Sequence, residues 1–146
     1  MVFRLASVLE HRQRQTEELE IALAGLLRQV TSLETSRAGL INEREIIRSQ
    51  IGGSGRLNLE EISHKLGYLT MVERRLAENA QAISEMLLQV DLKRAEVGEA
   101  LKEQKKVEKL RDRGMEKAAF DERLADTRLS DELGMIGFNT QQRGIA

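Results

Sequence analysis

The sequence predicts an all-α protein in which two long helices form an antiparallel coiled-coil hairpin with an overhanging C-terminal helical segment. Apolar residues recur at alternating spacings of three and four in two long runs. The segment Gly52-Gly53-Ser54-Gly55 separates these runs. The 146 residues include no proline, 32% are charged and only 3% are aromatic, which suits long exposed helices better than a globular core.

The first helix is expected over residues 3–51. Its apolar seam consists of two columns of residues spaced seven apart, and ten of the fourteen positions are apolar. One column is Leu5, Arg12, Leu19, Leu26, Leu33, Leu40 and Ile47, and the other is Leu9, Thr16, Leu23, Val30, Arg37, Arg44 and Ile51. A repeat of seven residues keeps one narrow stripe against one partner helix and imposes a left-handed supercoil.

A chain reversal is expected over residues 52–57, because glycine adopts positive φ at no steric cost. Asn58 is a good N-cap and Glu61 follows three residues later, as in a capping box. A phosphate-binding loop is the alternative interpretation of the glycines. That alternative requires a preceding strand and a following Gly-Lys-Ser/Thr, and the sequence has neither, so a turn is strongly favoured.

The second helix is expected over residues 58–133, with a flexible tail over residues 134–146, so that residues 1–146 form one rod-like domain. Ten of the thirteen positions in its seam are apolar. The first column is Ile62, Leu69, Leu76, Ile83, Val90, Val97 and Gln104, and the second is Leu66, Glu73, Ala80, Leu87, Arg94 and Leu101.

Folding the chain at the turn predicts that facing residues have numbers adding to about 110, the antiparallel geometry of a helix hairpin. Arg37 then faces Glu73, and this pair is expected to specify the register. Residues after Lys109 have no intramolecular partner, and they carry an apolar set at helical spacing: Leu110, Met115, Phe120, Leu124 and Leu129. This overhang is either a frayed tail or a docking segment for another protein, and its apolar stripe favours docking.

Charge and residue types exclude several classes of function. With 23 basic and 24 acidic residues the net charge is −1, so no global field attracts nucleic acid or an anionic membrane. No residue is cysteine, His11 and His64 lie far apart, and no apolar run could cross a membrane. We therefore expect a cytoplasmic protein with no enzymatic activity, cofactor, metal or direct membrane insertion. The basic stretch over residues 102–113 is interpreted first as a solvated face, then as a contact for an acidic protein, and last as a nucleic-acid site.

Two segments resemble the flagellar export protein FliJ family. The first is Phe3-Arg4-Leu5, followed by Val8-Leu9 and Arg12. The second is the run from Lys105 to Arg113, followed by the acidic pair and leucine at residues 131–133. The likeness extends over residues 3–133, nearly the whole chain.

The resemblance implies a two-helix stalk of the type III export apparatus of motile and chemotactic bacteria, whose partners are a hexameric export ATPase, the cytoplasmic part of the export gate, and export chaperones that it escorts. It also implies peripheral association with the membrane-bound apparatus. The implied ATPase-docking residues are Phe3, Leu5, Leu9, Arg12, Lys106, Leu110, Arg111, Met115, Phe120 and Leu124. The implied gate-facing residues are Leu40, Arg44, Ile47, Leu66, Leu69 and Glu73. The alternatives are a self-associating coiled-coil spacer and the equivalent stalk of a virulence-type secretion system.

Overall fold

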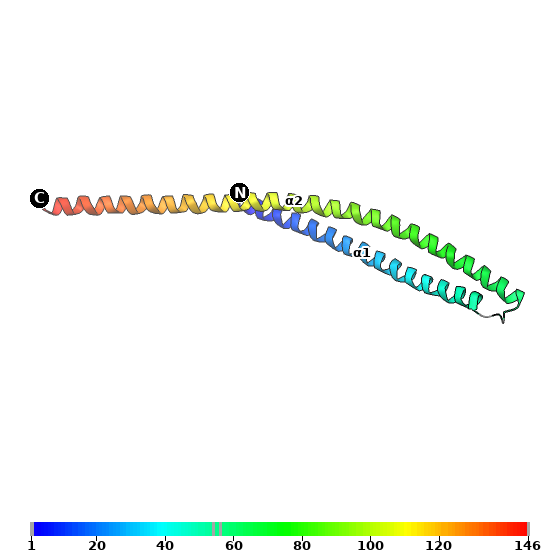
Figure 1. The fold of residues 1–146 in the computed structure, drawn as a ribbon. Helices are drawn as coiled ribbons and strands as arrows, with labels where there is room; N and C mark the ends of the chain where they lie inside the picture. The colour runs from blue at the N-terminus through cyan, green and yellow to red at the C-terminus, as the bar shows by residue number, and fades with distance from the viewer. Residues whose placement is uncertain (1, 54, 56, 146) are drawn as a thin grey trace. The chain divides into compact units, whose positions relative to one another are not determined.

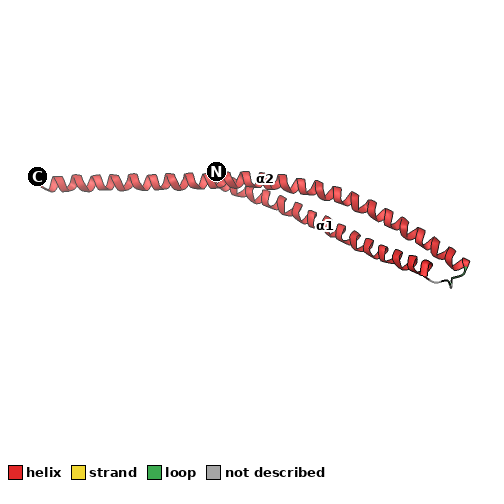
Figure 2. Cartoon of the chain, in the orientation of Figure 1, coloured by secondary structure: helices red, strands yellow, loops and turns green. Residues whose placement is uncertain are grey.

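The protein consists of two α-helices, α1 (Val2–Gly53) and α2 (Leu59–Ile145), shown in Figures 1 and 2. The computed structural model describes residues 2–53, 55 and 57–145, and the side chains of residues 4–53, 55 and 57–141. Two long helices with no strand among these residues confirm the predicted all-α helical hairpin.

The chain divides into two compact units, one of residues 16–99 and one of residues 1–15 with 100–146. The prediction of a single rod-like domain stays a prediction.

The unit of residues 16–99 is an antiparallel hairpin in which α1 and α2 lie side by side (Figure 1). Hydrogen bonds between the helices define its register. The Lys65 ammonium donates to the Gln50 amide oxygen at 2.7 Å, and the Asn79 amide nitrogen donates to the Leu33 carbonyl oxygen at 3.1 Å. The numbers of these partners add to 115 and 112, so the register differs from the predicted value of about 110 by up to roughly one helical turn.

The seam of α1 follows the sequence prediction closely. Thirteen of the fourteen predicted positions are buried or half-buried, and the exception is Arg37, which is exposed. Leu9, Thr16, Val30 and Ile47 are buried most completely. The seven-residue repeat therefore identified the packed face of α1 correctly.

One column of the α2 seam is correct and the other is wrong. All seven residues of the column from Ile62 to Gln104 are buried or half-buried, whereas five of the six in the column from Leu66 to Leu101 are exposed. The packed residues lie one position earlier, at Lys65, Val72, Asn79, Met86, Lys93 and Ala100.

The physical reason lies in the fit against α1. Val72 is completely buried, whereas Leu66 is 47% exposed. Asn79 is buried because its amide finds the carbonyl of Leu33, and the long stem of a lysine can cover an apolar seam while its ammonium reaches water. Counting apolar residues ignores both effects.

The predicted glycine turn at 52–57 is shorter than expected. Gly52 and Gly53 belong to the last turn of α1, and Gly55 lies in the connection. No described glycine has a positive φ, so the glycines of the connection do not use the left-handed conformation that motivated the prediction. Residues 54 and 56 of the predicted turn lie outside the described residues.

The start of α2 is capped as its sequence predicts. The Asn58 side-chain oxygen accepts a hydrogen bond from the backbone N–H of Glu61 at 2.7 Å, and the Asn58 carbonyl accepts from the N–H of Ile62 at 3.1 Å. Glu60 and Glu61 place negative charge in the first turn, where it interacts favourably with the helix dipole. This cap determines the residue at which α2 begins.

The predicted end of the second helix at residue 133 is wrong, because α2 continues to Ile145 through most of the segment expected to be a flexible tail. Gly134 and Gly137 lower helix propensity by about 1 kcal/mol each relative to alanine, but they do not remove a hydrogen bond as proline would. The Thr140 hydroxyl donates to the Ile136 carbonyl at 2.8 Å, one helical turn earlier. Glycine alone is thus a weaker stop signal than the prediction assumed.

Candidate functional site

The overhang is the most exposed apolar surface of the unit formed by residues 1–15 and 100–146. Every described residue from 115 to 141 is exposed. The exposed large apolar side chains of this part of α2 are Leu110, Met115, Phe120, Leu124, Leu129, Leu133, Met135, Ile136 and Phe138. The sequence prediction began the unpartnered segment after Lys109, but Arg111 and Gly114 are still half-buried, so the uninterrupted exposure begins only at residue 115.

The apolar side chains of the overhang form two stripes on opposite sides of the helix. At about 100° per residue, Phe120, Leu124, Met135 and Phe138 fall within one sector of about 60°. A second sector, about half a turn away, holds Met115, Leu129, Leu133 and Ile136. The sequence prediction treated the apolar residues as one set and missed this division.

Part of the predicted ATPase-docking set is used in the protein's own packing. In the unit that contains both segments, Leu9 is 4% exposed, and Leu5, Arg12 and Arg111 are half-buried. A buried side chain cannot contact a partner while α1 stays packed, so Leu9 is a structural residue in this structure. The side chain of Phe3 lies outside the described ones.

Lys106, another predicted docking residue, is exposed and donates to the Glu103 carboxylate at 3.0 Å. This hydrogen bond, with the charge of Lys106, lowers the pKa of Glu103 below its ordinary value, and the charge of Arg12 adds to the effect. Leu110, Met115, Phe120 and Leu124 are exposed as a docking role requires. Docking itself stays a prediction.

The predicted gate-facing set is likewise divided between packing and surface. Ile47 is buried, and Leu40, Arg44 and Leu69 are half-buried in the hairpin seam. Leu66 and Glu73 are exposed, because the second column of α2 turned out to lie outside the seam. These last two residues are therefore the most accessible members of the set.

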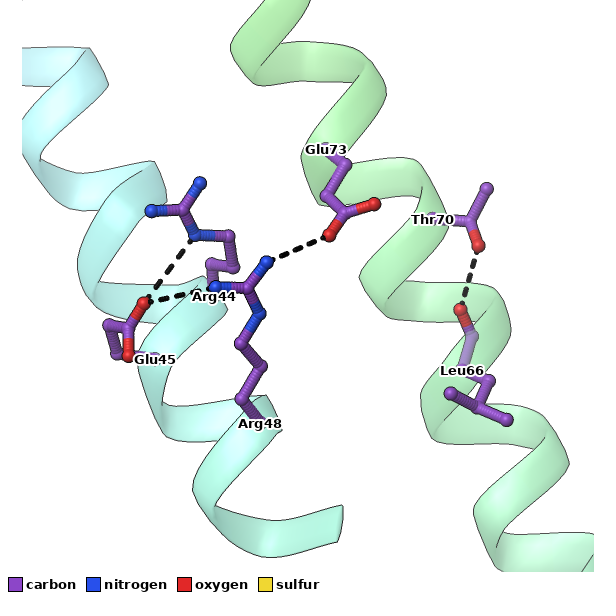
Figure 3. A network of polar contacts seen from close by, with 6 residues as sticks. All are labelled: Arg44, Glu45, Arg48, Leu66, Thr70 and Glu73. Carbon is purple, nitrogen blue, oxygen red and sulfur yellow. Dashed lines mark hydrogen bonds and ion pairs between the residues drawn. The ribbon is translucent and has the colours of Figure 1, made fainter. Parts of the chain in front are cut away.

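Glu73 pairs with a different arginine from the one predicted. Figure 3 shows the Arg48 guanidinium between two carboxylates, at 3.2 Å from Glu73 and 3.5 Å from Glu45. The Arg44 Nε lies 3.6 Å from Glu45, while Arg37 is exposed. The predicted Arg37–Glu73 pair is replaced by the Arg48–Glu73 pair, and both Arg37 and Glu73 lie outside the packed seam, where they are exposed.

Sequence reasoning also missed an exposed aromatic residue beside this network. The Tyr68 hydroxyl donates to the Glu43 carboxylate at 3.1 Å, and this hydrogen bond raises the pKa of Tyr68 above its ordinary value. Tyr68 is 39% exposed, and Leu66 and Met71 are also exposed nearby along α2. Tyr68 belongs to neither apolar column of the predicted α2 seam, so the heptad pattern gave no reason to select it.

In a comparison with protein-family models, residues 1–143 match the model described as flagellar FliJ protein. The chain belongs to the flagellar FliJ protein family. Comparisons with curated protein sequences and with solved structures give no match.

Membership of the FliJ family makes this a flagellar export-related protein, and members of the FliJ family are non-enzymatic components of the export system. No helix among the described residues is long and apolar enough to cross a membrane. The described residues also contain no cluster of His, Asp or Glu side chains suited to a metal ion, and both histidines are exposed.

Proposed function

We propose that the protein is a stalk that links a hexameric export ATPase to the cytoplasmic part of the export gate and escorts export chaperones. The observation that supports this proposal best is the overhang of α2. Its described residues from 115 to 141 are exposed, yet the segment carries large apolar side chains along its whole length. Apolar surface of this kind on a soluble protein usually marks an interface.

The two opposite stripes favour a partner that reaches the helix from more than one side. A helix that lies on a flat surface needs one apolar face, whereas a helix with apolar residues around it is enclosed in its functional state. The pore of a hexameric ring provides such an enclosure. We propose that residues 115–141 occupy the pore, with Lys106 and Leu110 at its entrance.

The gate contact is proposed for the exposed surface on α2 that follows the turn. Leu66, Tyr68 and Met71 are exposed within this short stretch. The carboxylates of Glu43 and Glu73 lie beside it and engage Tyr68 and Arg48. This surface contains apolar, aromatic and charged groups, the composition of a small protein interface.

The proposal is tested by measuring ATP hydrolysis of a purified hexameric export ATPase as a function of the concentration of this protein. Truncation after Gly114 removes the exposed overhang but keeps the half-buried residues before it. We expect this truncation to abolish stimulation. Phe120→Asp with Leu124→Asp, on one stripe, and Leu129→Asp with Leu133→Asp, on the other, should each reduce stimulation because both would bury unpaired charge.

A matched control is Ala119→Asp with Ser130→Asp, which adds the same two charges between the stripes. This control should stimulate the ATPase nearly as well as the unchanged protein. If the truncated protein keeps full stimulation, residues 115–141 do not dock and the stalk proposal is wrong.

The competing proposal is a spacer that associates with copies of itself. It rests on the same apolar stripes, which could pair between two overhangs. Light scattering distinguishes the two, since a spacer forms oligomers without the ATPase and loses them on truncation, whereas a stalk stays monomeric until the ATPase is added.

A further inference from the structure

A groove lies between the two helices of the unit of residues 16–99, away from both the turn and the overhang. Its volume is about 380 Å³. Its lining residues are Ala22 and Leu26 of α1 with Gln89, Leu92, Lys93 and Glu96 of α2. Ala22 and Leu26 are one helical turn apart, as are Gln89 and Lys93, so the groove follows both helices for at least one turn.

The α1 side of the groove is formed by Ala22, which is small and exposed, and by the half-buried Leu26. On the α2 side, Leu92 is 67% exposed and Leu88, one turn earlier, is 65% exposed. A shallow floor beside two protruding leucines leaves room for the backbone of another helix to approach closely.

Carboxylates surround this apolar surface. Glu18 lies one turn before Ala22, and Glu85 lies one turn before Gln89. Glu96 lines the groove itself and pairs with Lys93 at 3.0 Å. The Glu85 carboxylate accepts a hydrogen bond from the neutral Gln81 amide at 3.1 Å, so its charge is not neutralised by that contact.

The surrounding segments are acidic as a whole. Residues 17–28 and 85–99 contain seven acidic and three basic side chains, a net charge of −4, whereas the complete chain has a net charge of −1. Glu17, Glu20 and Asp91 lie on the opposite faces of their helices. The negative charge that faces the groove therefore comes mainly from Glu18, Glu85 and Glu96, beside Lys93 of the lining. A partner that carries the opposite charge is favoured in encounter and in orientation.

We propose that this groove binds an amphipathic helix of a partner protein whose apolar face is flanked by lysine or arginine. The partner helix lies over Ala22, covers Leu88 and Leu92, and places its basic residues opposite the surrounding carboxylates. This is the helix-in-groove mode of recognition, in which apolar anchors give affinity and charges give orientation. The proposal does not depend on the stalk function, because no residue of the overhang contributes to the groove.

The test uses three fluorescent helical peptides and measures anisotropy on titration with the full chain. The first peptide has an apolar stripe flanked by lysine and arginine, the second has the same stripe flanked by glutamate, and the third has the first composition with the stripe scrambled. We expect binding of the first alone, weakening as salt is added because charge contributes. Binding of the scrambled peptide with equal affinity would show attraction by charge only and would overturn the proposal.

Ala22→Leu tests the location, because Ala22 lines the groove and its side chain is exposed, so that a larger side chain there fills the groove. Leucine is also a good helix former, so the hairpin should remain folded. The matched control is Ala24→Leu, since Ala24 is exposed in the same helix and points about 200° away from Ala22. We expect Ala22→Leu to weaken binding by about tenfold or more, as on loss of an interface hot spot, with no change for Ala24→Leu.

Glu85→Lys with Glu96→Lys tests the charge contribution separately. These substitutions should weaken the basic peptide and strengthen the peptide flanked by glutamate. Equal binding of the basic peptide by the Ala22→Leu variant and the unchanged protein would overturn the proposal. So would sedimentation showing that Ala22→Leu disrupts a self-associated form, because the occupant would then be a second copy of this chain.

Discussion

Replacing Val72 by alanine tests which face of α2 packs against α1. Val72 is completely buried, so the substitution removes two methyl groups from the seam. The transfer free energy of these groups and the cavity left behind, less the better helix propensity of alanine, predict a loss of about 1 to 3 kcal/mol. The free energy of unfolding should fall by this amount, as measured by circular dichroism during urea denaturation.

The matched control is Leu87→Ala, at a position that the heptad pattern assigned to the seam. Leu87 is 44% exposed, so removing a larger side chain should cost at most about 1 kcal/mol. We therefore expect Val72→Ala to lower the free energy of unfolding more than Leu87→Ala does, although it removes the smaller group. The slope of the unfolding curve should stay the same in both variants, so that the midpoint shift reports stability.

A larger loss for Leu87→Ala than for Val72→Ala would refute the argument. It would mean that the column from Leu66 to Leu101 forms the seam and that the register follows the sequence prediction. Equal small losses would show that neither residue is packed in solution.

Two other predictions concern charged side chains. Arg48→Glu should destabilise the hairpin slightly and Glu73→Arg should restore part of the loss, with a coupling of roughly 0.2 to 1 kcal/mol because the pair is exposed. Arg37→Glu should show no coupling with Glu73 in the same urea assay, and a measurable coupling there would contradict the observed register. Lys106→Ala should raise the pKa of Glu103 toward its ordinary value, because the hydrogen bond from Lys106 is the main cause of the lowered pKa. Since the folded-state pKa is lowered, this contact stabilises the protein above the ordinary carboxyl pKa and is lost as pH falls through the folded-state pKa. NMR titration of the Glu103 carboxyl carbon measures the shift, and an unchanged value in the variant would exclude Lys106 as its cause.

The sequence predicted the fold class, the packed face of α1 and the cap of α2 because each is encoded locally. A seven-residue apolar repeat and an Asn58 cap need no knowledge of the partner helix. The phase of the α2 seam depends on that partner. The two columns beside Ile62 and Leu69 are similarly apolar, and the choice rests on how well Val72 and Asn79 fit against α1.

The candidate site was predicted in part for the same reason. The exposed overhang followed from the unequal lengths of the two apolar runs. Leu9 and Ile47 were named as contact residues because family resemblance assigns segments to partners without separating their packed and exposed faces. Tyr68 was not found at all, since a single aromatic residue outside the seam has no periodic signal.

The exposure of residues 115–141 has a consequence for how tightly they can be held by any partner. An isolated helix of this length is only marginally stable in water, so a partner must supply the free energy that keeps it helical. Affinity then depends on preorganisation as well as on contacts. A Cβ atom added to Gly134 or Gly137 meets no neighbouring atom within 4 Å. Gly134→Ala and Gly137→Ala would therefore strengthen binding without adding a contact, because they lower the conformational entropy lost on docking. The glycines of the overhang would then serve to keep the attachment reversible.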